Sequence, residues 1–154
     1  MPSVLLSAPH FEQSADGACL PTCTRMVLAY YGDLRTEATL SVLLGTKPYG
    51  TPISNVSRLA AWGYRADLVT LTRAELEAWL DQGVPIIVRV WTGMLDYWSV
   101  ETSHVVVVIG YDDDGVILND PGVTGPARLV LWDAFLAAWA EFDETAVVIP
   151  ANQR

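Results

Sequence analysis

The pattern of the sequence changes at Gly83, and this change constrains the fold more than any other feature. Before it, four segments combine helical spacing of apolar residues with capping residues or terminal glycines, namely 21–31, 37–44, 53–62 and 73–81. After it, short runs rich in β-branched residues predict strands at 85–91, 104–111, 116–119 and 128–131. Additional strands are expected at 3–6, 64–71 and 145–149, and a further helix at 132–140. Because helices and strands are segregated and do not alternate, the sequence predicts an α+β fold. We expect an N-terminal helical half packed on a C-terminal antiparallel sheet.

Local signals support the helices individually. Thr36 is the expected N-cap of the second helix, and Gly45 follows its end. Thr72 and Glu75 have the spacing of a capping box at the start of the fourth helix.

The length and charge of the chain exclude several classes of protein. A chain of 154 residues predicts a single domain over 1–154. With nine basic and eighteen acidic residues, the net charge of −9 argues against nucleic acid as a partner. The first 18 residues contain no Lys or Arg, so they do not resemble a secretory signal. No apolar run approaches the ~18 residues of a spanning helix, so we expect no membrane insertion, a cytoplasmic location and reduced thiols.

Cys19 lies where the first helix is expected to begin. The unpaired backbone N–H groups at a helix N-terminus stabilise a thiolate, which makes such a cysteine nucleophilic at neutral pH. The alternative for a single cysteine is a small buried apolar residue.

Two later residues could activate that cysteine. His104 opens an apolar strand, and a histidine titrates near neutrality, as a base for a thiol must. Asp120 follows a predicted strand and precedes Pro121, so its carboxylate could orient the imidazole. Gln13 could donate its amide to an oxyanion beside the backbone N–H of Cys19. Each residue has an ordinary structural alternative, but together they form a nucleophile, base and orienter set.

These motifs resemble the C39-type cysteine peptidases. The resemblance rests on Gln13 six residues before Cys19, on a helix ending in Tyr30-Tyr31-Gly32, and on His104 opening a Val-rich strand. It continues with Gly110-Tyr111-Asp112 and Asn119-Asp120-Pro121, and covers about residues 10–150. The resemblance implies a papain-like fold and a peptide or protein substrate.

The resemblance also implies roles. Cys19 would be the nucleophile, His104 the general base and then acid, Asp120 the orienter and Gln13 an oxyanion donor. The reaction would be peptide hydrolysis through a thioester acyl-enzyme, with no cofactor. No transporter segment is present in the sequence, so we expect a stand-alone peptidase.

Leu20 departs from the family pattern, which usually has Gly after the nucleophile. A leucine there could narrow the cleft or shift the backbone N–H groups. Leu20 and the lack of a transporter segment therefore leave open a non-catalytic module that binds peptides. An acyltransferase is a second alternative, because it would use the same residues as the peptidase.

Cys23 follows Cys19 by four residues, so both lie on one helix face. We expect a packed core thiol; a Cys19–Cys23 disulfide does not suit a regular helix. A zinc site has enough candidate ligands, but their spacing matches no common zinc motif. Those candidates are His10, Cys19, Cys23 and His104.

The acidic turn at 112–115 lacks the oxygen ligands and the glutamate of an EF-hand, so a hairpin turn is expected. With a regular two-residue turn, Asp120 would lie opposite Val107, on the sheet face away from His104. The proposed pair therefore predicts an odd-length loop or a bulge in this hairpin.

Four large side chains precede His104 in a stretch without a clear secondary-structure pattern. They could pack in the core or line a substrate pocket. They are Trp91, Met94, Tyr97 and Trp98.

Overall fold

The computed structural model describes residues 3–151 of the chain. Its strands are β1 (Val4–Leu5), β2 (Asp67–Thr70), β3 (Ile86–Trp91), β4 (Ser103–Tyr111), β5 (Gly115–Asn119), β6 (Arg128–Leu131) and β7 (Thr145–Val148). Its α-helices are α1 (Cys19–Tyr30), α2 (Glu37–Leu44), α3 (Arg73–Asp81) and α4 (Trp132–Ala140). Three 3-10 helices complete it: η1 (Asp16–Ala18), η2 (Ile53–Trp62) and η3 (Thr92–Met94).

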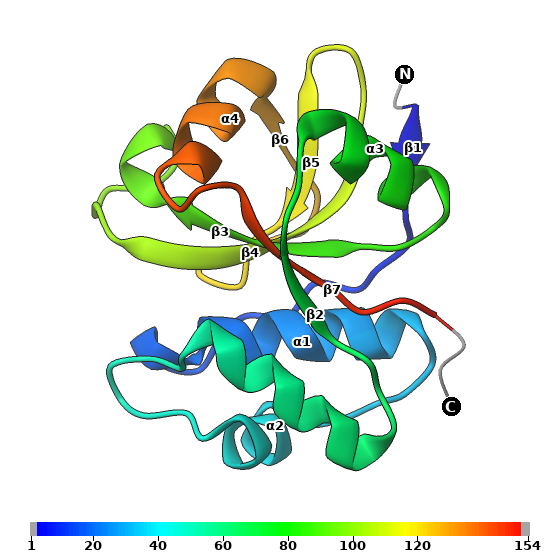
Figure 1. Ribbon diagram of the computed structural model, residues 1–154. Helices are drawn as coiled ribbons and strands as arrows, with labels where there is room; N and C mark the ends of the chain where they lie inside the picture. Colours follow the sequence, from blue (N-terminus) through cyan, green and yellow to red (C-terminus); the bar gives the residue numbers. More distant parts are fainter. Residues whose placement is uncertain (1–2, 152–154) are drawn as a thin grey trace.

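The strands form one sheet in the order β2-β7-β3-β4-β5-β6, and β1 pairs with β4. Each pairing between these strands is antiparallel. Figure 1 shows α1 and α2 on one side of the sheet, and α3 and α4 on the other. The expected α+β fold is therefore confirmed, although α3 leaves the N-terminal helical half and packs with α4.

Two hydrophobic cores lie on the two faces of the sheet, because successive side chains of a strand point to opposite faces. In β3, Ile86 and Val88 pack with the apolar residues of α3 and α4. Ile87 points the other way and packs with α1, α2 and η2. Arg89 follows two residues later and interrupts this buried apolar strand.

The segment 53–62 is helical as predicted but winds as a 3-10 helix. Its four large apolar residues recur at every third position. Because a 3-10 helix has three residues per turn, these four residues share one face. Val56 and Leu59 are buried in the core beside α1 and α2, and Ile53 and Trp62 pack against that core. Gly63 ends the helix at φ +85°.

The expected helix signals are present. The Thr36 side chain accepts from the backbone N–H of Thr39, and Gly45 closes α2 in the left-handed region at φ 69°. The capping box of Thr72 and Glu75 is complete. The first helix begins two residues before the predicted Pro21, at Cys19.

The hairpin between β4 and β5 contains a bulge, as predicted. Val108 pairs with Leu118, but the next pair is Gly110 with Ile117, so Ile109 is the additional residue. The bulge shifts the register by one residue, which returns the residue after Asn119 to the sheet face that carries His104.

Candidate active site

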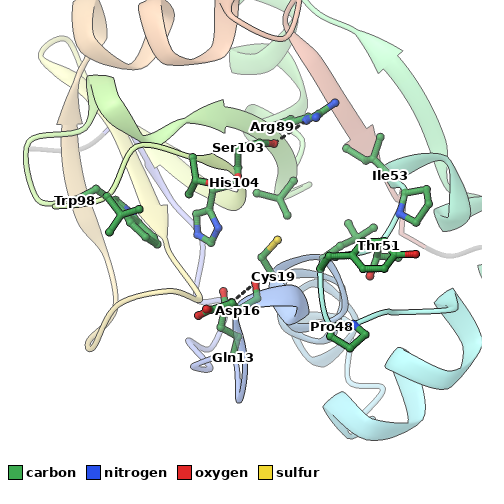
Figure 2. Close-up of a pocket in the computed structure, with 17 residues that line it drawn as sticks. Gln13, Asp16, Cys19, Pro48, Thr51, Ile53, Arg89, Trp98, Ser103 and His104 are labelled. Carbon is green, nitrogen blue, oxygen red and sulfur yellow. Dashed lines mark hydrogen bonds between the residues drawn. The ribbon is translucent and has the colours of Figure 1, made fainter.

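Cys19 is the first residue of α1, and Ala18 precedes it as N-cap. Its side chain is partly exposed and lines a cleft of about 720 Å³. Figure 2 shows the Cys19 sulfur and the His104 ring facing the same cavity from opposite sides. The sulfur therefore lies at the positive end of the α1 dipole, open to a ligand in the cleft.

His104 and Asp120 are joined directly. The Nε2 atom of His104 lies 2.7 Å from Oδ1 of Asp120, and both side chains are buried. With Nε2 engaged by the carboxylate, Nδ1 is the ring nitrogen left for the cysteine. Burial alone would lower the pKa of His104, but hydrogen bonds with Asp120 and with Cys19 raise that pKa to about 9. The imidazole is therefore protonated at neutral pH.

The Asp120 carboxylate accepts three further hydrogen bonds. Oδ1 also accepts from the backbone N–H of Gly122 at 2.8 Å, and Oδ2 accepts from Tyr97 Oη and Trp98 Nε1, each at 2.8 Å. Burial would raise the pKa of Asp120, but His104, Trp98 and Gly122 lower it below the ordinary 3.8. The carboxylate is therefore ionised and fixed in place.

Gln13 lies at the same cleft. Its Nε2 donates to the carbonyl oxygens of Ala15 at 2.8 Å and Asp16 at 3.1 Å, just before Cys19. Its Oε1 is buried without a hydrogen-bond partner among residues 3–151.

The N-terminal segment is fastened to the turn that carries Asp120. His10 Nε2 lies 2.7 Å from the Asp120 carbonyl oxygen, and the Gln13 N–H donates to the Pro121 carbonyl at 2.8 Å. Asn119 Nδ2 donates to the Ala8 carbonyl at 3.0 Å. These contacts bring Gln13 and Asp120 together across more than 100 residues of sequence.

Glu37, the first residue of α2, holds the loop before Cys19 from the other side. Its carboxylate accepts from Ser14 N at 2.8 Å, from Ser14 Oγ, and from Thr22 Oγ1 at 2.9 Å. Burial would raise the pKa of Glu37, but the Ser14 and Thr22 hydrogen bonds lower it. The loop between Gln13 and Cys19 is thus positioned by both α2 and the Asp120 turn.

Of the four residues singled out in the sequence, Gln13, Cys19 and His104 line one cleft, and Asp120 contacts His104 from outside it. The Peptidase_C39 like family matches residues 5–147 of the chain. The chain belongs to the Peptidase_C39 like family. No protein among the curated sequences matches it.

Solved structures of C39 peptidases have the same fold as this family member. One, from Bacillus anthracis and assigned to the C39-like peptidases, is 18% identical with a TM-score of 0.83, and 100% of each chain is covered. The peptidase domain of Streptococcus ComA, a bifunctional ABC transporter, is 21% identical with a TM-score of 0.74. That match covers 93% of this chain and 98% of the other.

A third similar structure is a double glycine motif protease from an AMS/PCAT transporter in complex with its leader peptide. It is 18% identical with a TM-score of 0.76, and the match covers 97% of this chain and 96% of the other. At these identities the three structures establish the C39 fold.

Leu20, the departure from the usual glycine, points mainly into the C39-like core. It is 2% exposed and packs in the core beside α1 and α2, and it also contributes to the cleft lining. Cys19 keeps helical backbone angles, with φ −65° and ψ −44°. The leucine is therefore accommodated without displacing the start of α1 from a helical conformation.

Cys23 is a buried core thiol, as expected. Its Sγ lies 3.4 Å from the Val105 carbonyl oxygen, and neither cysteine is in a disulfide. Burial, with Cys19 and Asp120 nearby, raises the pKa of the Cys23 thiol well above its ordinary value.

Among residues 3–151, no group of three or more His, Cys, Asp or Glu side chains is arranged to hold a metal ion. In the same residues, no helix has the length and apolarity needed to cross a membrane.

The aromatic stretch before His104 contributes to the lining of the cleft and also contacts His104 and Asp120. The Trp98 ring lies 4.7 Å from the His104 ring, centroid to centroid, and Tyr97 and Trp98 both donate to Asp120. Their role as donors was not predicted, although Tyr and Trp have the polar handle that a buried carboxylate needs. The opposite wall of the cleft, 48–53, was also not predicted.

Gly17 allows that wall to approach the start of α1. A Cβ at position 17 would lie 2.5 Å from the Lys47 carbonyl oxygen and 2.6 Å from the Pro48 carbonyl oxygen. Because these are backbone atoms, Gly17→Ala must displace the loop, and overpacking of this kind costs about 1–3 kcal/mol. We expect urea denaturation to show that loss in the free energy of unfolding. Ala15→Gly, in the same loop, is the control; Gly32→Ala would not serve, because Gly32 has φ +88°. A Gly17→Ala protein with the wild-type free energy of unfolding would contradict the packing.

The His104 pKa predicts a dependence of stability on pH. Because the folded-state pKa of about 9 exceeds the ordinary 6.5, the protonated ring stabilises the folded state fully below pH 6.5. This contribution is lost as the pH rises through 9. We expect urea unfolding between pH 6.5 and 9.5 to show a larger loss of stability in the wild type than in His104→Ala. Parallel curves for the two proteins would show that the ring is not stabilised in its charged form.

Proposed function

We propose that this C39-like protein is a thiol-dependent peptide hydrolase, with Cys19 as nucleophile, His104 as base and acid, and Asp120 as orienter. The observation that carries the proposal is the buried 2.7 Å contact of His104 with Asp120, beside a cleft that Cys19 enters from a helix start. A cysteine that served only packing would not need an ionised, fully hydrogen-bonded carboxylate behind its neighbouring histidine.

The reaction starts with the Cys19 proton already on His104, so that a thiolate faces an imidazolium. The thiolate attacks the peptide carbonyl carbon, forming a C–S bond and a tetrahedral oxyanion. The oxyanion collapses, the C–N bond breaks, and the imidazolium gives its proton to the leaving amine. Water, deprotonated by the now neutral His104, then attacks the thioester, and Cys19 leaves as the thiolate.

We assign the oxyanion to the backbone N–H of Cys19 and the side-chain amide of Gln13. The Gln13 amide already lies at the cleft, held by the Ala15 and Asp16 carbonyls, so an N–H must turn from one of them toward the oxyanion. One such donor contributes about 10²–10³-fold in kcat.

The substrate class we propose is a peptide or an extended protein segment. The cleft volume of about 720 Å³ is large enough for several residues of an extended chain. A solved relative of this fold holds a leader peptide, which favours a peptide ligand here as well.

We further propose that residues 1–154 act as one domain in the cytoplasm, with no cofactor.

The test is digestion of a synthetic peptide library, with products identified by mass spectrometry. Wild-type protein is expected to generate new amino termini by addition of water, and Cys19→Ala is expected to generate none. Cys23→Ser is the matched control, because it removes the other thiol, and it should keep the activity. Equal cleavage by Cys19→Ala would contradict the proposal.

The same digestion separates the hydrolase from an acyltransferase. Hydroxylamine or glycinamide is added as an amine acceptor in a parallel reaction. A hydrolase gives mainly free carboxyl products at low amine concentration, whereas a transferase gives mainly the amine adduct. Retention of peptides without any cleavage by the wild type would identify a binding module.

A further inference from the structure

Arg89 is an unexpected residue at its position in the fold. It lies in β3 just past the end of the pairing with β7, where β3 still pairs with β4, and the five other residues of β3 are apolar. It pairs with Val105, which also lines the cleft, one residue beyond His104. The Arg89 side chain is half-buried, so protein or ligand groups must replace part of the water around its charge.

The guanidinium is held by groups that do not neutralise it. Its Nε donates to Ser103 Oγ at 3.1 Å, and its Cζ lies 4.1 Å from the ring centroid of Phe142. No carboxylate of residues 3–151 forms an ion pair with it within 4.0 Å, whereas Arg35, Arg65 and Arg73 each have one. The ring and the serine fix the plane of the guanidinium and leave its two terminal nitrogens available.

Arg89 also lines the cleft, where it adds a second positive group to the protonated ring of His104. Of the side chains that line the cleft, only Asp16 and Arg89 belong to the Asp, Glu, Lys and Arg set. Figure 2 shows Asp16 beside Gln13, and Arg89 on the sheet side, joined to Ser103 by its hydrogen bond. In a chain of net charge −9, a positive group at the sheet wall marks a local site for an anion.

We propose that Arg89 selects peptides that place a carboxylate against the sheet wall of the cleft. The terminal nitrogens of a fixed guanidinium match the two oxygens of a carboxylate in a bidentate pair. The carboxylate belongs to an Asp or Glu side chain of the substrate or to its C-terminus. The inference rests on the proposed function, since it names the substrate class of the same site.

The experiment uses one library of random decapeptides, prepared both with free C-termini and with amidated C-termini. Wild type is expected to cleave peptides with Asp or Glu at one position about tenfold more often than those with Asn or Gln, as a charged hydrogen-bonded pair implies. A preference that disappears with amidated termini identifies the C-terminal carboxylate as the group bound.

Three variants at position 89 test the assignment. Arg89→Gln keeps a donor for Ser103 and should reduce the preference to less than about twofold, and Arg89→Lys should keep part of it. Arg89→Glu should favour Lys or Arg at the same position. Arg73→Gln, on α3 and outside the cleft lining, is the control and should keep the full preference. Equal thermal unfolding of the Gln and Lys variants confirms that they are folded.

A second arm separates this inference from the proposed function. Cys19→Ala protein is immobilised, and the peptides it retains from the same library are sequenced, which needs no cleavage. If the wild type cleaves no peptide, only the hydrolase proposal is rejected. The role of Arg89 is still supported if acidic peptides are enriched on the immobilised protein and this enrichment disappears in Arg89→Gln. Two results would overturn the inference. Either the peptides that are retained or cleaved are not enriched in acidic residues, or the enrichment is the same in Arg89→Gln.

Discussion

Replacing His104 with alanine is expected to lower kcat/KM for peptide hydrolysis by about 10³–10⁴-fold. The imidazole would act twice, first on the Cys19 proton and then on the leaving amine, and no other described side chain in the cleft can replace it. Its Nε2 is fixed by Asp120 at 2.7 Å, so the loss removes both the proton carrier and its orientation.

His10 provides the matched control for that variant. It is the other histidine of the chain and lies beside the same turn, but its Nε2 contacts the backbone carbonyl oxygen of Asp120 and not the carboxylate. We expect His10→Gln to keep at least a tenth of the wild-type kcat/KM. If His104→Ala kept as much activity as His10→Gln, His104 would not be the base.

Replacing Asp120 with alanine is expected to damage both activity and stability. The change leaves the Tyr97 hydroxyl, the Trp98 indole N–H and the Gly122 N–H without their buried acceptor, and removes the counter-charge of His104. Breaking a buried ion pair of this kind costs about 3–5 kcal/mol. Without the orienter, kcat/KM should fall by about 10²–10⁴-fold.

Urea denaturation and peptide hydrolysis measure the two effects on the same protein. Asp120→Asn retains one acceptor oxygen but turns an N–H₂ group toward other donors, so we expect an intermediate loss of stability. Asp81→Ala is the control, because Asp81 is exposed and accepts a hydrogen bond from the Tyr111 hydroxyl at 2.7 Å, outside the site. An Asp120→Ala protein within about 1 kcal/mol of wild type would contradict the hydrogen-bond network described here.

The parts of the fold that sequence predicts are those set by local physics. Capping residues and terminal glycines act within one turn, so the ends of α2 and α3 were predicted correctly. The β4–β5 bulge was predicted from function, because only a shifted register lets Asp120 share a sheet face with His104. The 3-10 winding of η2 was missed, although its apolar spacing of three residues contains that information.

The parts that sequence did not predict depend on contacts between distant residues. Nothing local to Tyr97 and Trp98 indicates a buried carboxylate more than 20 residues later. The wall at 48–53 approaches Cys19 because Gly17 lacks a side chain, and this packing has no signature in either segment alone. The catalytic roles of Gln13, Cys19, His104 and Asp120 remain predictions, now with a shared site to support them.

The most direct test of the account is the rate of Cys19 alkylation by iodoacetamide at neutral pH, in a Cys23→Ser background. We expect fast alkylation at neutral pH that becomes much slower in His104→Ala, because the imidazolium stabilises the thiolate. Slow alkylation at neutral pH, at a rate that is the same with and without His104, would show that no activated cysteine and histidine pair exists.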